Sequence, residues 1–315
     1  MSKSDRNPSQ TSAQALGLVA VGAMAISWAA PLVKVIEAAP STIGYYRLLF
    51  AALSLLPVAF LALRTKPRPS HYRSLFWAAL SGVVFGFDLA LFHRAILLTG
   101  AGLATLLANT QIFWVAIISG TLLKEKPPKN FLGWSCVAIM GVALLTVPGL
   151  VNQTLDPTGI LMGIGTAFFY GSYILTLRQC QSIDDAWPMS VNLAVSCAFG
   201  ALTLFSVTCF TGESTAFPDL RNFLWLVVLG LAVHVGGWAF ISKGMPHLPA
   251  RISSMTILLQ PVLTTIWGVA FFGELFGVYD GIGAVFTLAA IYAVAVAGTK
   301  SMEPDEAIPE ESANA

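Results

Sequence analysis

Long stretches without any charged residue are the feature that most limits what this chain can fold into. A helix needs about 20 mostly apolar residues to cross the hydrocarbon core of a bilayer. Runs of at least 19 residues that lack Asp, Glu, Lys and Arg cover 7–33, 95–123, 130–155, 157–177, 186–212, 222–242, 252–273 and 281–299. These eight runs predict a protein that lies within a membrane.

Two further segments are apolar but carry an ionisable residue. Residues 41–63 include Arg47 near their start, and residues 75–97 hold Asp88 in their middle. With these two segments we expect an all-α integral membrane protein with ten transmembrane helices. Composition agrees, because 10% of residues are charged, against about a quarter in soluble domains. The net charge of +1 supplies no basic field for phosphates, so we expect no nucleic-acid partner.

Basic residues between the spans predict the orientation of the chain. Cytoplasmic loops are enriched in Lys and Arg. With the N-terminus inside, the cytoplasmic segments hold 13 of the 17 basic residues, including the clusters in 64–73 and 124–129. We therefore expect both termini in the cytoplasm.

We expect the two ends of the chain to be tails outside the membrane, and we expect the cysteines to bind no metal. Residues 1–13 are polar and lack the order of a secretory signal, so we expect a cytoplasmic tail. Residues 299–315 are acidic and poor in large apolar side chains, which predicts a disordered cytoplasmic tail. The four cysteines have no metal-binding spacing. We expect no metal and no cofactor.

The sequence also repeats itself. An offset of 149 residues carries Gln111 to Gln260 and Glu125 to Glu274, and an offset of 142 carries the aromatic Trp28 to Tyr170. We therefore expect two repeats, at 14–147 and 159–298, with five spans each. Because five is odd, the second repeat enters the membrane from the opposite side, an arrangement typical of transporters.

Several motifs resemble one family. Trp28 and Lys34 on the first span, the stretch 46–52 (YRLLFAA) that opens the second, and the stretch 260–274 of the ninth, followed by Gly281 and Gly283, are similar to drug/metabolite transporters of the EamA type. The resemblance implies a ten-helix exporter or permease of small metabolites, such as amino acids, in the bacterial inner membrane, with no ATPase subunit.

The first half departs from the family pattern at two places. Gln111-Ile112 stands where the family usually has a proline, and Lys124-Glu125 stands where Gly-Glu is usual. We therefore expect the fourth membrane helix to be straighter than its counterpart, the ninth.

Two ionisable residues lie near the middle of their spans. Asp88 and His234 are both roughly 18–20 Å from a span end, at 1.5 Å per residue, and they belong to equivalent helices of the two repeats. Because a charge at this depth costs about 2.5–3.5 kcal/mol on insertion scales, each needs a reason. They could face a shared cavity and bind an ammonium group or a proton. They could instead form a buried structural pair that orients the helices.

Other polar and aromatic residues are candidates for the same pathway. Because binding sites are mostly apolar with few polar anchors, we expect the pathway to include Trp238, Trp28, Tyr170, Gln111, Gln260 and Asn109. The alternatives are interfacial anchoring for the tryptophans and hydrogen bonding between helices for the amides. Arg47 and Pro261 are candidates for gating and for a hinge.

The leading functional hypothesis is secondary transport of a small metabolite by alternating access, with export as the expected direction and either a proton gradient or the substrate's own gradient as the driving force. An uptake permease for a vitamin or quaternary amine, an intramembrane enzyme and a membrane scaffold are the alternatives. The chain has no GxxxxGK[ST] loop, and Asp88 with His234 is too small a set for catalysis, so we do not expect an enzyme. The expected partners are a small-molecule substrate, lipid and protons, and the expected oligomeric state is a monomer.

Overall fold

The computed structural model describes residues 8–65, 69, 72–127, 130–150, 156–216 and 219–300. Residues 1–7 and 301–315, which belong to the two expected tails, lie outside the described residues. Every regular element in the described part of the chain is a helix. This confirms an all-α fold, as expected where backbone N–H and C=O groups must be bonded within the segment that crosses a membrane.

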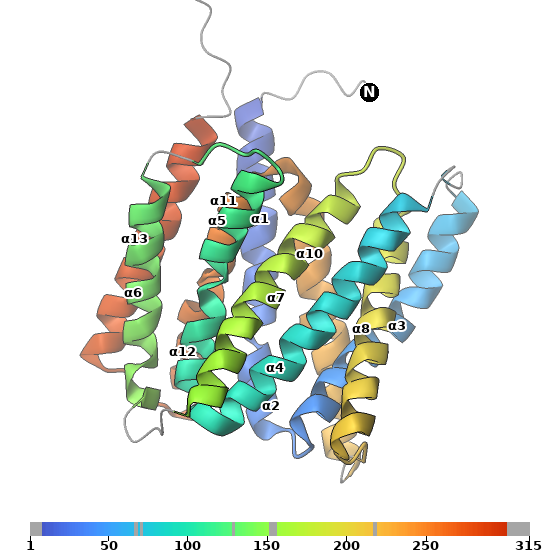
Figure 1. Cartoon of the computed structure of the whole chain (residues 1–315), viewed down its shortest axis with the longest axis horizontal. Helices are drawn as coiled ribbons and strands as arrows, with labels where there is room; N and C mark the ends of the chain where they lie inside the picture. Colours follow the sequence, from blue (N-terminus) through green and yellow to red (C-terminus); the bar gives the residue numbers. More distant parts are fainter. Residues whose placement is uncertain are drawn as a thin grey trace, which may run out of the picture.

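The helices lie side by side in one bundle (Figure 1). In chain order they are α1 Pro8–Ser27, α2 Ala29–Val35, α3 Pro40–Thr65, α4 Arg73–Asn109, α5 Gln111–Thr121, α6 Phe131–Leu150, α7 Pro157–Gln181, α8 Met189–Thr211, α9 Leu220–Val228, the π-helix η1 Leu229–Val235, α10 Gly236–Gly244, the 3-10 helix η2 Met245–His247, α11 Ala250–Ile257, α12 Leu259–Phe272 and α13 Val278–Lys300.

Eight helical stretches within the described residues are long and apolar enough to cross a membrane. They are Ser12–Val35, Pro40–Thr65, Arg73–Thr121, Pro157–Gln181, Met189–Thr211, Leu220–His247, Ala250–Phe272 and Val278–Ala297. Phe131–Thr146 is a shorter apolar helix. The stretch Arg73–Thr121 has 49 residues, about twice the length that one crossing needs.

One interruption of this long stretch lies at a glycine. Gly100 has φ 79° and ψ 162°, a combination that is essentially available to glycine only. In Figure 1 the long first part of α4 runs down the bundle, and α5 runs back up it. The chain therefore reverses direction within a stretch of continuous apolar sequence.

Small residues let the two halves of the chain pack closely. Helix α4 packs along α7 and α8, α3 along α8, α1 along α10, and α6 along α13. At Gly82 of α4 a Cβ atom would lie 2.1 Å from the backbone oxygen of Ser196 on α8. At Gly22 of α1 it would lie 2.5 Å from the backbone oxygen of Gly237 on α10. Close backbone approach of this kind is how small residues hold membrane helices together.

The helix ends that follow α5 and α12 have the same local geometry. Lys124 has φ 54° and Gly273, 149 residues later, has φ 68°. The next residue in each case bonds back to the preceding helix, because Glu125 N donates to Ser119 O at 3.1 Å and Glu274 N donates to Gly268 O, also at 3.1 Å. The 149-residue offset thus relates both partners of this hydrogen bond in the two halves of the chain.

The expectation of a straighter helix in the first half is wrong. Helices α4 and α5 are separated at Thr110 (φ −66°, ψ −2°), and α11 and α12 are separated at Leu258 (φ −63°, ψ −5°). The Thr110 hydroxyl donates to the Leu107 carbonyl at 2.6 Å, and such side-chain bonds to the preceding turn bend helices. The first repeat therefore has a break at Thr110 without a proline, and the second has a break at Leu258 close to Pro261.

Replacing Gly100 tests the reversal in α4. We expect Gly100→Ala to lower the free energy of unfolding by about 1–3 kcal/mol, because alanine is strained at the glycine-only dihedral angles. Thermal unfolding in detergent measures the change. Gly17→Ala is the control, since a Cβ atom at Gly17 meets no atom within 4 Å. Equal stability of the two variants would contradict the assigned backbone at Gly100.

Replacing Lys124 should change the free energy of unfolding in the opposite direction. A lysine in the left-handed region is strained, whereas glycine is not. We expect Lys124→Gly to raise the free energy of unfolding by about 0.5–1 kcal/mol. Lys126→Gly, two residues further along the same exposed segment, should lower it slightly because it only adds freedom to the unfolded chain. A loss of stability in Lys124→Gly would argue against the shared helix-end geometry.

Candidate functional site

Three ionisable side chains from three helices are buried in the centre of the apolar bundle. Arg47 of α3 is 7% exposed, Asp88 of α4 is 5% exposed, and His234 of η1 is 2% exposed. Burying such groups in an apolar medium is costly unless they are bonded or paired. Their surroundings therefore decide what they can do.

Arg47 and His234 are in direct contact. The Arg47 Nε donates to His234 Nδ1 at 3.3 Å, so Nδ1 must act as the acceptor and the ring must be neutral. The ring proton then lies on Nε2, which is 3.4 Å from Cys197 Sγ on α8. The imidazole is thus oriented from both sides, in one tautomer.

The backbone around His234 is adapted to this contact. His234 lies in the π-helix Leu229–Val235, and single-turn π-helices insert an extra residue that redirects side chains, often at functional sites. Gly230 of the same turn lies against α3, where a Cβ atom would be 2.9 Å from Arg47 O. The absence of a side chain at Gly230 therefore lets η1 approach the helix that carries Arg47.

Asp88 lies within electrostatic range of Arg47. Its Oδ1 is buried and has no hydrogen-bond partner within the described part of the chain. A buried acceptor without a donor is rare and costs roughly 1–3 kcal/mol or more. Asp88 therefore offers an unsatisfied acceptor at the centre of the bundle.

Aromatic rings form one wall of this site. Phe85 stacks on Tyr173 with ring centroids 4.2 Å apart, and Tyr173 meets Trp238 edge to face at 4.5 Å. Phe85 also stacks on His234 at 5.7 Å. Trp238 is fully buried in this wall, which places it beside His234 on the same helical stretch.

Tyr170 of α7 connects the site to α12. Gln260 Nε2 donates to the Tyr170 hydroxyl oxygen at 3.4 Å, and Tyr170 lies within electrostatic range of both Asp88 and Arg47. The structure thus brings together six of the residues singled out in the sequence, namely Arg47, Asp88, Tyr170, His234, Trp238 and Gln260.

The other candidates have different surroundings. Trp28 stacks on Trp267 at 4.8 Å and lines an apolar groove of about 510 Å³ between α1, α2, α9, η1 and α12. Gln111 is buried and donates to Ser254 O at 3.3 Å. Asn109 donates to the carbonyl of Thr105 in its own helix at 2.8 Å.

Pro261 is the third residue of α12 and follows the turn at Leu258. Its carbonyl accepts a hydrogen bond from Thr265 Oγ1 at 3.1 Å. The interruption between α11 and α12 and the proline are therefore only three residues apart, next to Gln260.

Three further buried residues were not predicted from the sequence as part of the site, namely His93, Tyr173 and Cys197. His93 is buried and its Nδ1 has no partner within the described residues. Its position within an apolar span was a signal, because ionisable residues there are usually functional. Tyr173 and Cys197 carried no such signal, since both are common in apolar helices.

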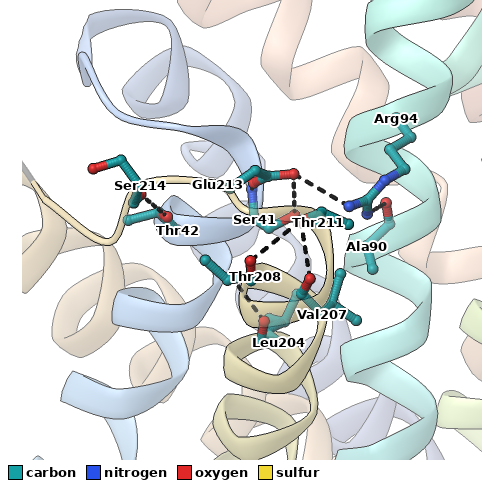
Figure 2. Close-up of polar contacts among 10 residues, drawn as sticks. All are labelled: Ser41, Thr42, Ala90, Arg94, Leu204, Val207, Thr208, Thr211, Glu213 and Ser214. Carbon is teal, nitrogen blue, oxygen red and sulfur yellow. Dashed lines mark hydrogen bonds and ion pairs between the residues drawn. The ribbon is translucent and has the colours of Figure 1, made fainter.

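One end of the site's helices is held by the segment after α8 (Figure 2). The Glu213 carboxylate accepts from Ser41 N at 3.1 Å and from Ser41 Oγ at 3.2 Å, at the start of α3. It also pairs with Arg94 of α4 at 3.2 Å. Figure 2 shows Ser214 beside Thr42, whose hydroxyl donates to the Ser214 carbonyl at 2.6 Å. This carboxylate therefore ties α3 and α4, which carry Arg47 and Asp88, to α8.

Comparison with known proteins agrees with this architecture. An uncharacterized transporter of Helicobacter pylori is 26% identical over 63% of this chain and 63% of its own length. The uncharacterized transporter YwfM of Bacillus subtilis is 23% identical over 86% of this chain and 89% of that protein. The threonine/homoserine exporter RhtA of Escherichia coli K12 is 26% identical over 73% and 72%.

A solved crystal structure has the same fold. It superposes with a TM-score of 0.72 at 16% sequence identity, over 94% of this chain and 99% of that chain. The family model described as the EamA-like transporter family matches the sequence twice, over residues 11–147 and 157–296. The chain belongs to the EamA-like transporter family, within the drug/metabolite transporter superfamily.

Proposed function

We propose that this protein is a secondary active transporter that moves a small zwitterionic metabolite, such as an amino acid, across the bacterial cytoplasmic membrane by alternating access. Membership of a transporter family supports transport as the activity. The exporter name of RhtA, a relative at 26% identity, favours amino-acid export for this chain as well.

The observation that carries the proposal is the pair of opposite charges in the buried site. Arg47 uses Nε for His234, and within the described residues its two terminal nitrogens have no protein acceptor. A guanidinium group binds a carboxylate in a bidentate fork. Asp88, with its free Oδ1, can accept a hydrogen bond from an ammonium group. The two side chains together match the two charges of a zwitterion.

The proposal includes ten membrane crossings in two inverted repeats, over 14–147 and 159–298. The reversal at Gly100 supports two crossings within Arg73–Thr121. The start of α1 and the end of α13 lie at the same end of the bundle in Figure 1, as an even number of crossings requires. The distribution of basic residues supports a cytoplasmic location for that end.

Proton coupling is the proposed driving force. Asp88 and His234 are ionisable groups inside the bundle, and such groups commonly form proton relays in transporters. In the observed arrangement His234 accepts from Arg47 and is neutral. A proton taken up by Asp88 would remove the negative charge that binds the substrate ammonium group. Proton binding and substrate binding would then exclude each other, as proton-driven export requires.

Substrate-induced thermal stabilisation tests the proposed function. The purified protein is heated with a panel of amino acids, vitamins and quaternary amines. A ligand present at 100 times its Kd stabilises the folded state by about 2.7 kcal/mol. We expect an amino acid to stabilise the parent protein and not the variants Asp88→Asn and His234→Ala. Flux of that amino acid into proteoliposomes, with and without a pH gradient, then measures transport and coupling.

Asp280→Asn is the matched control for Asp88→Asn. Asp280 is equally buried, 4% exposed, and accepts from Gly277 N at the start of α13. This variant should keep the ligand response. A response that survives in Asp88→Asn and His234→Ala would contradict the proposed site. A response only to quaternary amines or vitamins would contradict the proposed substrate.

Arg47→Lys tests carboxylate recognition separately. Lysine keeps the charge but lacks the planar fork. We expect this variant to fold and to weaken amino-acid binding at least about tenfold, the effect of losing roughly 1.4 kcal/mol. Arg64→Lys, at the exposed end of the same helix, is the control and should bind as the parent does. Unchanged affinity in Arg47→Lys would remove Arg47 from the substrate site.

A further inference from the structure

We infer that two ion pairs, Glu125–Arg178 and Lys34–Glu274, are the two gates of the transporter, each closing one mouth of the central site. The inference rests on the proposed function. Glu125 follows α5 and Arg178 lies in the last turn of α7. Lys34 lies in the last turn of α2 and Glu274 follows α12. The ends of α5 and α7 lie at the top of the bundle in Figure 1, and the ends of α2 and α12 lie at its bottom.

The acids of the two pairs are related by the sequence repeat, whereas the bases are not. The offset of 149 carries Glu125 to Glu274, while the offset of 142 carries Lys34 to Thr176 and not to Arg178. Both glutamates follow a residue in the left-handed conformation and bond back to their own helix at the same distance. The repeat therefore places one of the two acids at each end of the bundle, and each acid pairs with a base from the other half of the chain.

The pair at the α5 end is the more enclosed of the two. Arg178 Nη1 lies 2.9 Å from Glu125 Oε1, and the two side chains are 17% and 18% exposed. Glu125 Oε2 also accepts from Ala250 N at 3.0 Å, and Glu125 O accepts from Arg251 Nη1 at 2.6 Å. These bonds join α5, α7 and α11 at one point. The ion pair at this end is therefore reinforced by bonds to a third helix.

The pair at the opposite end is open to solvent. Lys34 Nζ and a Glu274 carboxylate oxygen form an ion pair whose side chains are 58% and 44% exposed. An exposed pair is screened and weak, whereas a partly buried pair with further hydrogen bonds is harder to break. The structure thus has unequal gates, and the weaker is at the end of α2 and α12.

Both gates are connected to the central site through the helices that they join. Helix α7 carries Tyr170 and ends at the first gate. Helix α12 carries Gln260 near its start, and Glu274 of the second gate follows its end. The hydrogen bond between Gln260 and Tyr170 couples these two helices at the level of Asp88. Breaking one ion pair while the other holds would expose the site to one side of the membrane, as alternating access requires.

Distances across each mouth test the inference. Spin labels on Lys126→Cys and Ser182→Cys span the first mouth, and labels on Glu37→Cys and Leu275→Cys span the second. All four positions are exposed. The exposed native cysteines, Cys136 and Cys209, are replaced by serine, and each labelled protein must first keep the ligand-induced stabilisation of the parent. Pulsed electron paramagnetic resonance in proteoliposomes then gives the distance distributions.

We expect Glu125→Gln to raise the population of long distances across the first mouth at least about twofold, the change produced by a bias of roughly 0.4 kcal/mol, without lengthening the second. Lys34→Gln should do the reverse. Asp184→Asn and Lys243→Gln remove exposed charges of the same signs and should change neither distribution. The exchanged pair, Glu125→Arg with Arg178→Glu, restores the ion pair but not the hydrogen bond from Ala250 N, so it should recover part of the short-distance population that Glu125→Gln loses.

The result that overturns the gates is a pair of distributions that do not respond to either variant, or that open together in one variant, while the parent protein transports its ligand. Absence of binding and flux in the parent protein overturns the proposed function instead. The two failures are therefore read from different measurements.

Discussion

Burial of Arg47 among apolar helices is the constraint on which the centre of the molecule depends. A guanidinium group cannot lose its charge by deprotonation in a protein, so its surroundings must supply acceptors. His234 supplies one through Nδ1, and this contact requires η1 to approach α3 at Gly230. Asp88 supplies opposite charge without a direct hydrogen bond. The remaining bonding capacity of both charged groups is the basis of the proposed zwitterion site.

The interruptions in the helices have a common consequence. In hydrocarbon an irregular backbone is tolerated only where it is buried in protein or lines a cavity. The breaks at Thr110 and Leu258, the π-helix that carries His234, and the reversal at Gly100 divide the apolar stretches into shorter rigid pieces. Two of these breaks are followed within two residues by the amides Gln111 and Gln260, which place polar groups in the bundle. Short helices joined at such points can move relative to one another while their internal hydrogen bonds persist.

Much of the fold was predictable from sequence, because the length and hydropathy of a continuous segment largely decide whether it can cross a bilayer. Charge-free runs predicted the apolar helices, and Asp88 and His234 were identified because charge is rare at that depth. Other features were not predictable in this way. The partnership of Arg47 with His234 joins residues 187 positions apart, and Tyr173 and Cys197 enter the site through packing. The straighter fourth helix was expected from the missing proline, yet a threonine turn interrupts it at nearly the same place.

The sequence by itself determined that this chain is a helical membrane protein with two similar halves, because transfer of apolar and charged groups from water to lipid depends on composition along the chain. It also determined the pairs of residues that the repeat relates, such as Glu125 and Glu274. Only the tertiary structure decided which of these residues meet and how exposed they are. Glu125 is bonded to Arg178, Ala250 and Arg251 at one end of the bundle, whereas its repeat mate Glu274 is paired with an exposed lysine at the other. That difference arises from the packing of neighbouring helices, which the order of residues along the chain does not reveal.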